Sequence, residues 1–295
     1  MKLIDINKDK KIYPKLLSKL SDAPSLLYAE GNFELLNSVS IAIVGSRRAS
    51  EKGIKLAQKF ASELSSTGIT IVSGLARGID TAAHTYSYNQ KGKTIAVLGT
   101  GLNNIYPPEN TDLSKKIIDN GGVVITELDP KSDKSSSKFK ERNRIISGLS
   151  IGVLIIEAKY KSGTSITATY ATKQHKPVFV LPHEIDNPHG AGTNRLLKNG
   201  AIPVTDTLDI LNNLKLTKYK EIYKKIKKEQ ISKNSKFDLH DSKQSKVFKL
   251  IKKTPITPND LARITNFSIN EILSILFLLE MDGYIKKAQG GYICT

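Results

Sequence analysis

Residues 40–50 read SIAIVGSRRAS: an aliphatic run followed by a glycine, a serine and two arginines. A run that is apolar at successive positions is typical of a strand that is buried on both faces of a sheet. Gly45 permits a sharp turn after that strand, and Ser50 can cap a helix that begins directly after it. This stretch therefore predicts a buried strand, a tight turn and a helix N-terminus in immediate succession.

The same pattern recurs along residues 40–214. We predict six strands, each a short aliphatic run with glycine or proline at its edge: residues 40–45, 68–74, 93–99, 122–127, 151–158 and 177–181. Helical stretches stand between strands, for example at residues 50–66, 81–90 and 165–175. Repeated alternation of strand and helix predicts right-handed crossovers and helices on both faces of the sheet. The predicted fold class is therefore α/β, with an extended Rossmann-like, doubly wound and mostly parallel sheet.

Three further segments flank this domain. Residues 1–39 predict a short helical lead-in that packs on the core. Residues 215–240 hold nine lysines against three acidic residues and indicate a basic linker or a solvated helix. Residues 241–295 predict three helices, at 242–252, 258–265 and 268–282, followed by a tyrosine-containing hairpin. That order of elements is typical of a small C-terminal winged-helix domain.

The composition indicates which kind of partner the protein binds and in which compartment it is expected. The net charge of +17 and the pI near 9.7 indicate a polyanionic partner. The one cysteine, Cys294, excludes an internal disulfide and a cysteine-based zinc site. The first residues contain no apolar signal core, and the longest apolar stretch, near residues 272–279, is far shorter than the ~20 residues of a membrane span. We expect a cytoplasmic protein that does not contact a membrane.

The end of the first predicted strand carries residues suited to phosphate. In open α/β sheets, ligands bind beyond the carboxyl ends of the strands. Here Gly45, Ser46 and Arg47 stand at such an end, and an arginine can contact a phosphate through two parallel hydrogen bonds. The helix that Ser50 caps would add unpaired backbone N–H groups, which attract anions. We therefore expect these residues to contact the phosphate backbone of a nucleic acid, with Ser50 supporting the pocket.

The second predicted strand ends in SGLARGID at residues 73–80. Ser73 offers a hydroxyl, and Gly74 and Gly78 allow a ligand to approach the backbone closely. Asp80 can cap the next helix or orient His84, which follows it by one turn. We expect the first three residues to line the pocket and the last two to support it.

Residues 129–144 predict a mobile basic loop with six basic residues, several serines and one aromatic ring. Cations that follow a phosphate backbone and an aromatic face that accepts any base are what single-strand binding requires. The residues that we expect to contact a single strand here are Lys138, Phe139, Lys140, Arg142, Asn143 and Arg144.

A later strand end adds a further anion-binding element on the same side of the sheet. Glu157 ends the strand, and Ser162, Gly163 and Thr164 open the next helix. Hydroxyl groups at a helix N-terminus suit an anion, so we expect these three residues to contact the ligand and Glu157 to support the pocket.

The sequence contains no convincing motif for catalysis or for cofactor binding. GKT at residues 92–94 lacks the glycine of a P-loop five positions before it, and GTG at residues 99–101 lacks the third glycine of a dinucleotide fingerprint. There is no serine-centred nucleophile elbow. His183, Glu184, Asp186 and His189 could be imagined as metal ligands, but the prolines at 182 and 188 favour a plain loop. The sequence predicts no catalytic residue, no metal and no cofactor.

Taken together, these motifs resemble the DprA/Smf family of DNA-processing proteins over nearly the whole chain. The matching pieces are Tyr13-Pro14, Gly31-Asn32, Gly45-Ser46-Arg47, residues 73–80 with Ala83-His84, Tyr106-Pro107, Asn110, Arg142-Asn143-Arg144, Glu157-Ala158, Ser162-Gly163-Thr164, Gly192-Thr193-Asn194 and Gly200-Ala201. The chain departs from the usual family pattern at Lys140, where proline is common, and at Lys52 and His183.

The resemblance implies a protein that is not an enzyme. It implies binding of single-stranded DNA in a basic pocket, homodimerisation, protection of the strand, and loading of the RecA recombinase during natural transformation. Arg47 would lie in the phosphate pocket with Ser73 and Gly74 lining it. Lys138, Phe139, Arg142 and Asn143 would fall in the region that contacts the strand.

Two other functions remain open on the residues alone. One is a nucleotide-binding enzyme of the lysine-decarboxylase-like or phosphoribohydrolase type, which has the same broad fold but a Pro-Gly-Gly-x-Gly-Thr loop. This chain has Ser162-Gly163-Thr164 without the glycine pair.

The other is a winged-helix transcription regulator. A helix that reads base edges in the major groove should present arginine, lysine, asparagine or glutamine to them. The predicted third tail helix instead carries Glu271, Glu280 and Asp282, no basic residue and many apolar side chains. We therefore expect the tail to serve protein contact or regulation.

Overall fold

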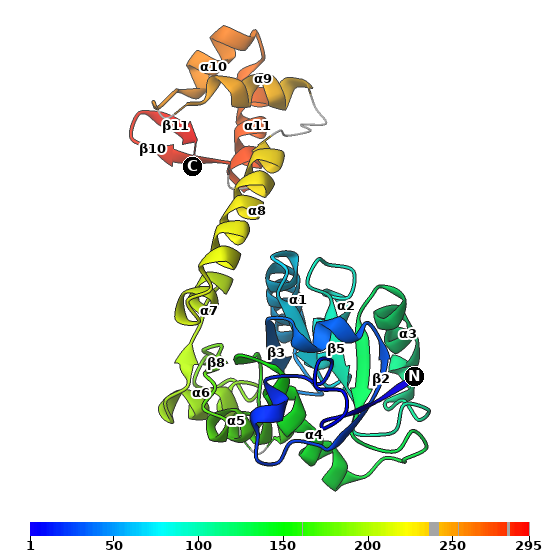
Figure 1. Ribbon diagram of the computed structural model, residues 1–295. Helices are drawn as coiled ribbons and strands as arrows, with labels where there is room; N and C mark the ends of the chain where they lie inside the picture. Colours follow the sequence, from blue (N-terminus) through cyan, green and yellow to red (C-terminus); the bar gives the residue numbers. More distant parts are fainter. Residues whose placement is uncertain (161, 236–241, 253, 282–283, 295) are drawn as a thin grey trace. The chain divides into compact units, whose positions relative to one another are not determined.

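The computed structural model describes residues 1–160, 162–235, 242–252, 254–281 and 284–294. The chain divides into two compact units, Met1–Lys225 and Ile226–Thr295 (Figure 1).

The first unit is built on one nine-stranded sheet with the order β1-β2-β6-β5-β4-β3-β7-β8-β9. The seven strands from β6 through β5, β4, β3, β7 and β8 to β9 are parallel to one another, whereas β2 pairs antiparallel with β6 and β1 pairs antiparallel with β2. The strand bounds are β1 Lys2–Asp5, β2 Leu26–Gly31, β3 Ser40–Val44, β4 Thr70–Ser73, β5 Thr94–Val97, β6 Val123–Thr126, β7 Val153–Ile155, β8 Val178–Val180 and β9 Ile202–Pro203. All six predicted strands are present, and the predicted α/β class with a mostly parallel sheet is confirmed.

Helices cover both faces of the sheet (Figure 1). Their bounds are α1 Glu51–Ser66, α2 Ile79–Thr85, α3 Thr111–Asp119, α4 Ser136–Leu149, α5 Gly163–Lys173, α6 Ala191–Lys198 and α7 Thr207–Asn213, with a short 3-10 turn, η3, at Pro108–Asn110. Successive side chains of β3 point to opposite faces. Ile41 and Ile43 therefore join one core with Phe60 of α1, while Val44 joins the other core with Ile146 of α4.

The lead-in at residues 1–39 is not helical as predicted. It forms β1 and β2, with only short 3-10 turns at η1 Leu17–Lys19 and η2 Phe33–Asn37. Leu27 and Ala29 of β2 are buried and alternate with less buried neighbours, which is the period of a strand that covers one face. The lead-in does pack on the core, because Tyr13 and Leu17 belong to the same apolar cluster as β3.

The predicted basic loop at residues 129–144 is also wrong in part, because residues 136–144 are the first part of α4. The buried face of this helix carries Arg142, Ile145, Ile146 and Leu149. These positions follow the i, i+3, i+4, i+7 spacing of a helix that packs on a core. An arginine at the first of them concealed the apolar period in the sequence.

The topology creates one position that favours ligand binding. From β3 the chain continues outward through β4, β5 and β6 on one side, and from β7 through β8 and β9 on the other. β3 and β7 are adjacent and parallel, so the direction of winding reverses between them. Ligands of doubly wound sheets bind beyond the carboxyl ends of the strands at such a switch point.

The predicted basic linker at residues 215–240 is helical over most of its length. α8 spans Thr217–Ser235, and Tyr223 is buried in the core of the first unit, where its hydroxyl donates to Glu63 at 3.1 Å. Leu214 and Leu216 pack against the same core. Residues 236–240 of the predicted linker lie outside the described residues.

After the end of α8, the described residues of the second unit form three helices and a hairpin, in the order predicted for a winged helix. They are α9 Ser242–Leu250, α10 Pro258–Thr265, α11 Ile269–Met281, β10 Ile285–Ala288 and β11 Gly291–Cys294, and the two strands pair antiparallel. Asp282, placed in the third helix by the sequence, lies outside the described residues. Within the described ranges no single helix is long and apolar enough to cross a membrane, and α10 and α11 reach that length and hydropathy only together, across a bend of 117°.

Candidate functional site

A large cavity lies at the carboxyl ends of the central strands, where the winding of the sheet reverses. Its volume is about 1130 Å³, and it is lined by the turn after β3, by α4, by the segment after β7, by the first turn of α5 and by Arg195 of α6. Pockets for single small ligands usually measure about 300–1,000 Å³. The cavity is therefore large enough for a ligand that is bigger than a single small molecule.

The described lining of the cavity is strongly basic. Its cations are Arg47, Arg48, Lys134, Lys140, Arg142, Lys159 and Arg195, and its one carboxylate is that of Asp80. Asp80 is buried, whereas all of these cations except Arg142 are exposed. Charges of one sign that line a concave surface concentrate their field there, so the cavity attracts polyanions.

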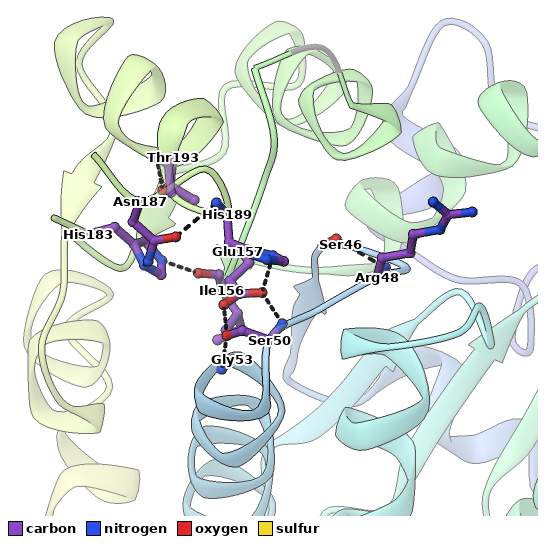
Figure 2. A network of polar contacts seen from close by, with 11 residues as sticks. Ser46, Arg48, Ser50, Gly53, Ile156, Glu157, His183, Asn187, His189 and Thr193 are labelled. Carbon is purple, nitrogen blue, oxygen red and sulfur yellow. Dashed lines mark hydrogen bonds and ion pairs between the residues drawn. The ribbon is translucent and has the colours of Figure 1, made fainter. Parts of the chain in front are cut away.

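Glu157 holds the turn after β3 in place, as Figure 2 shows. The Glu157 carboxylate is 1% exposed and accepts hydrogen bonds from the Ser50 backbone N–H at 2.9 Å and from the Ser50 hydroxyl. The Ser50 hydroxyl oxygen in turn accepts from the Gly53 N–H at 2.9 Å, which caps α1. A negative charge at a helix N-terminus is stabilising, so Glu157 fixes both the start of α1 and the turn that carries Arg47.

The loop that contains His183 and His189 packs on the other side of Glu157 (Figure 2). His189 Nδ1 lies 3.6 Å from a Glu157 carboxylate oxygen, and the His189 carbonyl accepts from the Ala158 N–H at 3.0 Å. His183 Nε2 lies 2.8 Å from the Ile156 carbonyl oxygen. These histidines therefore brace the end of β7, and among the described residues no group of three or more histidine, cysteine, aspartate or glutamate side chains could hold a metal ion.

The turns after β3 and β4 pack directly against each other. Gly78 adopts a φ of +74°, and a Cβ at this position would overlap the Ser46 carbonyl oxygen. A Cβ on Gly45 would overlap the Ile79 side chain. Gly78 therefore does not line the cavity itself but allows the start of α2 to approach the Arg47 turn.

Arg142 does not lie where the sequence analysis placed it. Its side chain is buried, and one guanidinium nitrogen donates to the carbonyls of Gly74 and Val97, which end β4 and β5. A Cβ on Gly74 would overlap this guanidinium, so the glycine makes room for the arginine. Burial lowers the pKa of Arg142 to about 10, which still leaves the group charged at neutral pH. Arg142 therefore supports the floor of the cavity, and it is not an exposed contact for a strand.

Asp80 and His84 are buried behind the same turn. The Asp80 carboxylate accepts from the Gly74 N–H at 3.1 Å, and burial raises its pKa while the positive charge of Arg142 opposes that shift. His84 Nε2 accepts from the Leu75 N–H at 3.3 Å, and its Nδ1 lies 2.8 Å from the Thr94 hydroxyl. That hydroxyl donates to the Ile71 carbonyl, so the network assigns the His84 proton to Nδ1. His84 is therefore a neutral structural residue.

The burial of His84 predicts a loss of stability in mild acid. Burial lowers its pKa to about 3, whereas an unfolded histidine titrates near about 6.5. Between these two values the unfolded chain binds a proton that the folded chain does not bind. The free energy of unfolding should therefore fall by about 1.4 kcal/mol per pH unit as pH decreases below about 6.5.

This expectation can be measured by denaturant unfolding of the wild type and of His84→Gln at pH 7, 6 and 5. Glutamine does not titrate, so the difference in free energy of unfolding between the two proteins should shrink as pH falls. A difference that is independent of pH would show that His84 has the same pKa in the folded and the unfolded chain, and would contradict its burial as a neutral residue.

An aromatic pair with two stacked cations forms one wall of the cavity. The rings of Tyr106 and Phe139 lie 5.6 Å apart, centroid to centroid. The Arg47 guanidinium lies 5.4 Å from the centre of the Phe139 ring, and Lys134 lies 5.1 Å from that of Tyr106. A ring beside a cation can stack on a base while the cation contacts the adjacent phosphate. We call Tyr106, Phe139, Arg47 and Lys134 the first station.

The first turn of α5 closes the opposite wall. Ser162, Gly163 and Thr164 all line the cavity, as does Asn143, whose side-chain amide donates to the Gly163 carbonyl at 3.4 Å. The buried Ser162 hydroxyl has no hydrogen-bond partner among the described residues.

Several expected contact residues lie outside the cavity. Ser73 donates to the Ile43 carbonyl at 2.7 Å within the sheet, and Arg144 pairs with Glu127 and donates to the Asp22 carbonyl. Lys138 is absent from the described lining of the cavity, whereas Lys140 lies in it. Of the six contact residues predicted in the basic segment, Phe139, Lys140 and Asn143 thus line the cavity, as does the buried Arg142.

The cavity lining also includes residues to which the sequence assigned no individual contact with a ligand. They are Arg48, Tyr106, Lys134, Lys159, Tyr160 and Arg195. Arg48 and Lys159 follow strand ends directly and could have been selected on that ground. Tyr160 and Arg195 are 35 positions apart, and only the pairing of β7 with β8 brings their segments together.

Comparisons with known proteins agree with this arrangement. Residues 5–215 match the family model described as DNA recombination-mediator protein A, and residues 235–291 match the DprA winged helix domain. The chain is 36% identical to protein Smf of Escherichia coli over 289 residues, which cover 97% of this chain and 75% of that protein. It is 43% identical to DNA processing protein DprA of Streptococcus pneumoniae over 199 residues, which cover 68% and 70% of the two chains.

Two solved structures share the fold. The X-ray structure of DprA from Streptococcus pneumoniae superposes with a TM-score of 0.67 at 40% identity, covering 72% of this chain and 73% of that one. DNA processing protein A from Helicobacter pylori, a structure described for its single-stranded DNA binding mode, gives a TM-score of 0.63 at 33% identity, covering 68% and 92%. The chain belongs to the DNA recombination-mediator protein A family, the DprA/Smf proteins.

Proposed function

We propose that this protein binds single-stranded DNA in the cavity, without strong preference for sequence. The observation that carries the proposal is the combination of exposed cations and aromatic rings at the switch point of the sheet. Cations contact every phosphate alike, and an aromatic face stacks on any base. The binding mode described for the Helicobacter pylori relative supports the same class of ligand.

The described lining supports binding in preference to catalysis. It contains no histidine or cysteine, and its one carboxylate, Asp80, is buried and already accepts a backbone hydrogen bond. A nucleotide hydrolase needs a general base within reach of water, and the accessible side chains of this lining are cations, hydroxyls and rings. The phosphoribohydrolase alternative is therefore disfavoured.

Membership of the family extends the proposal to partners. We infer that the bound strand is protected, that the protein loads the RecA recombinase onto it during natural transformation, and that the protein acts as a homodimer in the cytoplasm. The support for these inferences is the family, and the geometry of the cavity adds that a strand bound there would have its phosphates covered by protein.

The tail supports protein contact over reading of duplex DNA. On α11, Glu271 is held by Lys243 at 2.6 Å, Glu280 is exposed, and Leu273 and Phe277 are exposed apolar side chains. The carboxylates of this helix repel phosphates, and Asn270 is the one residue of α11 among the four types that read base edges. Specific duplex binding by the second unit would contradict this inference and favour the transcription-regulator alternative.

The direct experiment is fluorescence anisotropy with labelled oligo-dT and a matched duplex over a salt series. We expect tighter binding of the single strand and a log–log salt slope of about −3.5 if about five phosphates are contacted. Preference for the duplex would assign DNA binding to the tail. No binding to either, together with turnover of a nucleoside monophosphate, would support the enzyme alternative.

A further inference from the structure

The cavity contains a second pair of aromatic ring and cation, far from the first station. The Arg195 guanidinium lies 4.9 Å from the centre of the Tyr160 ring. Tyr160 is 57% exposed although both residues line the cavity. An exposed tyrosine with a cation stacked on it keeps ring surface available to a ligand.

The fold holds the two residues together from separate elements. Tyr160 follows β7, and Arg195 lies on α6, which follows β8. The Gly192 N–H donates to the Ala158 carbonyl at 2.7 Å, and a Cβ on Gly192 would overlap the Lys159 carbonyl. This close approach of α6 to the segment after β7 brings the turn of Arg195 beside Tyr160.

The two aromatic sites lie on opposite sides of the switch point. Phe139 of the first station packs on Gly99, just beyond the end of β5, whereas Tyr160 follows β7. The order β5-β4-β3-β7 places three strand spacings between them, or about 14 Å at about 4.8 Å each. Neighbouring bases in a duplex strand rise by only about 3.4 Å, so one stacked base cannot reach both sites.

We propose that Tyr160 and Arg195 form a second station that stacks on another base of the same single strand. This inference rests on the proposed function. From the first station the strand would pass the first turn of α5 and reach the second station, and its phosphates would meet the cations and backbone N–H groups of the cavity lining. The ligand class is thus a single strand that is several nucleotides long, because a mononucleotide would occupy one station only.

The test uses the full chain and a fluorophore placed at the station. The chain contains no tryptophan, so Tyr160→Trp introduces a single one and keeps an aromatic ring. We expect its emission to be quenched when oligo-dT binds, because a stacked base quenches indole. An abasic oligonucleotide of the same length should bind through its phosphates without quenching. Tyr86→Trp is the matched control, because Tyr86 is 43% exposed and outside the described lining.

Affinity provides an independent measurement. Base stacking on an aromatic side chain is worth enough that Tyr160→Ala should weaken oligo-dT binding about five-fold or more. Tyr160→Phe should bind like the wild type, and Tyr160→Ala should not alter binding of the abasic strand.

Two results would overturn the second station: unchanged emission of Tyr160→Trp at saturating oligo-dT, or an equal loss for oligo-dT and the abasic strand in Tyr160→Ala. Either result leaves the proposed function intact if the wild type still binds oligo-dT. Absence of oligo-dT binding by the wild type would instead contradict the proposed function itself.

Discussion

Replacing Arg142 with leucine is expected to lower the free energy of unfolding by about 3–5 kcal/mol, because removing one member of a buried charge pair leaves the other uncompensated. Three groups depend on this guanidinium. The Gly74 and Val97 carbonyls accept from it, and its charge opposes the burial-raised pKa of Asp80. All three lie directly under the cavity, so the variant should also bind single-stranded DNA poorly at temperatures where it is still folded.

A double-mutant cycle separates the charge effect from the loss of hydrogen bonds. Asp80→Asn in the Arg142→Leu background removes the uncompensated carboxylate and should recover part of the lost stability. Lys140→Leu is the matched control on the same helix, since Lys140 is exposed and its replacement should change stability by less than about 0.5 kcal/mol. An Arg142→Leu protein as stable as the wild type would show that Arg142 is not buried as described.

The strands of the central sheet were predictable because a strand that is buried on both faces has aliphatic residues at successive positions. In β3, Ile41 and Ile43 face one core and Ala42 and Val44 the other, so no polar residue interrupts the pattern. β1 and β2 carry no such signal. β1 is the edge strand and pairs with β2, and the pairing of β2 with β6 is a contact between segments about 95 positions apart that no local pattern specifies.

The prediction for α4 was wrong for a different reason, because its local pattern was interpreted as a loop. Its core-facing positions are spaced as in any amphipathic helix, but Arg142 occupies one of them. An arginine in the core requires acceptors from other segments, here the ends of β4 and β5, and these partners become visible only in three dimensions. The sequence therefore indicated a basic loop where the fold has a buried structural arginine.

The candidate site likewise contains residues that the sequence could predict and residues that it could not. Residues in the connections between strands and the following helices, such as Arg47 and Ser162, could be selected because parallel strands end at one edge of the sheet. Glu157 could be selected for the same reason, although its bond to Ser50 depends on the pairing of β3 with β7. Tyr160 with Arg195 could not, since the pair joins the segment after β7 to α6 and each residue alone is an ordinary surface side chain.

Replacing Arg47 with alanine is expected to weaken binding of all single-stranded sequences by about ten- to hundred-fold. Arg47 is exposed, and its guanidinium has no hydrogen-bond or ion-pair partner in the described part of the chain beyond its stacking over Phe139. Its donors are therefore free for a phosphate, and a hydrogen bond to a charged group is worth about 1.5–3 kcal/mol. Loss of one phosphate contact should also reduce the log–log salt slope by about 0.7.

Two further variants decide which property of Arg47 matters. Arg47→Lys keeps the charge but loses the planar fork, so it should restore the salt slope more fully than the affinity. Arg77→Ala removes the same charge at a position outside the described lining, where Arg77 pairs with Glu109 on the surface, and should leave binding nearly unchanged. If Arg47→Ala and Arg77→Ala weakened binding equally, the net charge of the protein and not the cavity would attract the strand. If only Arg47→Ala did so, the turn that Glu157 and Ser50 hold in place would be the point where the phosphate backbone is bound.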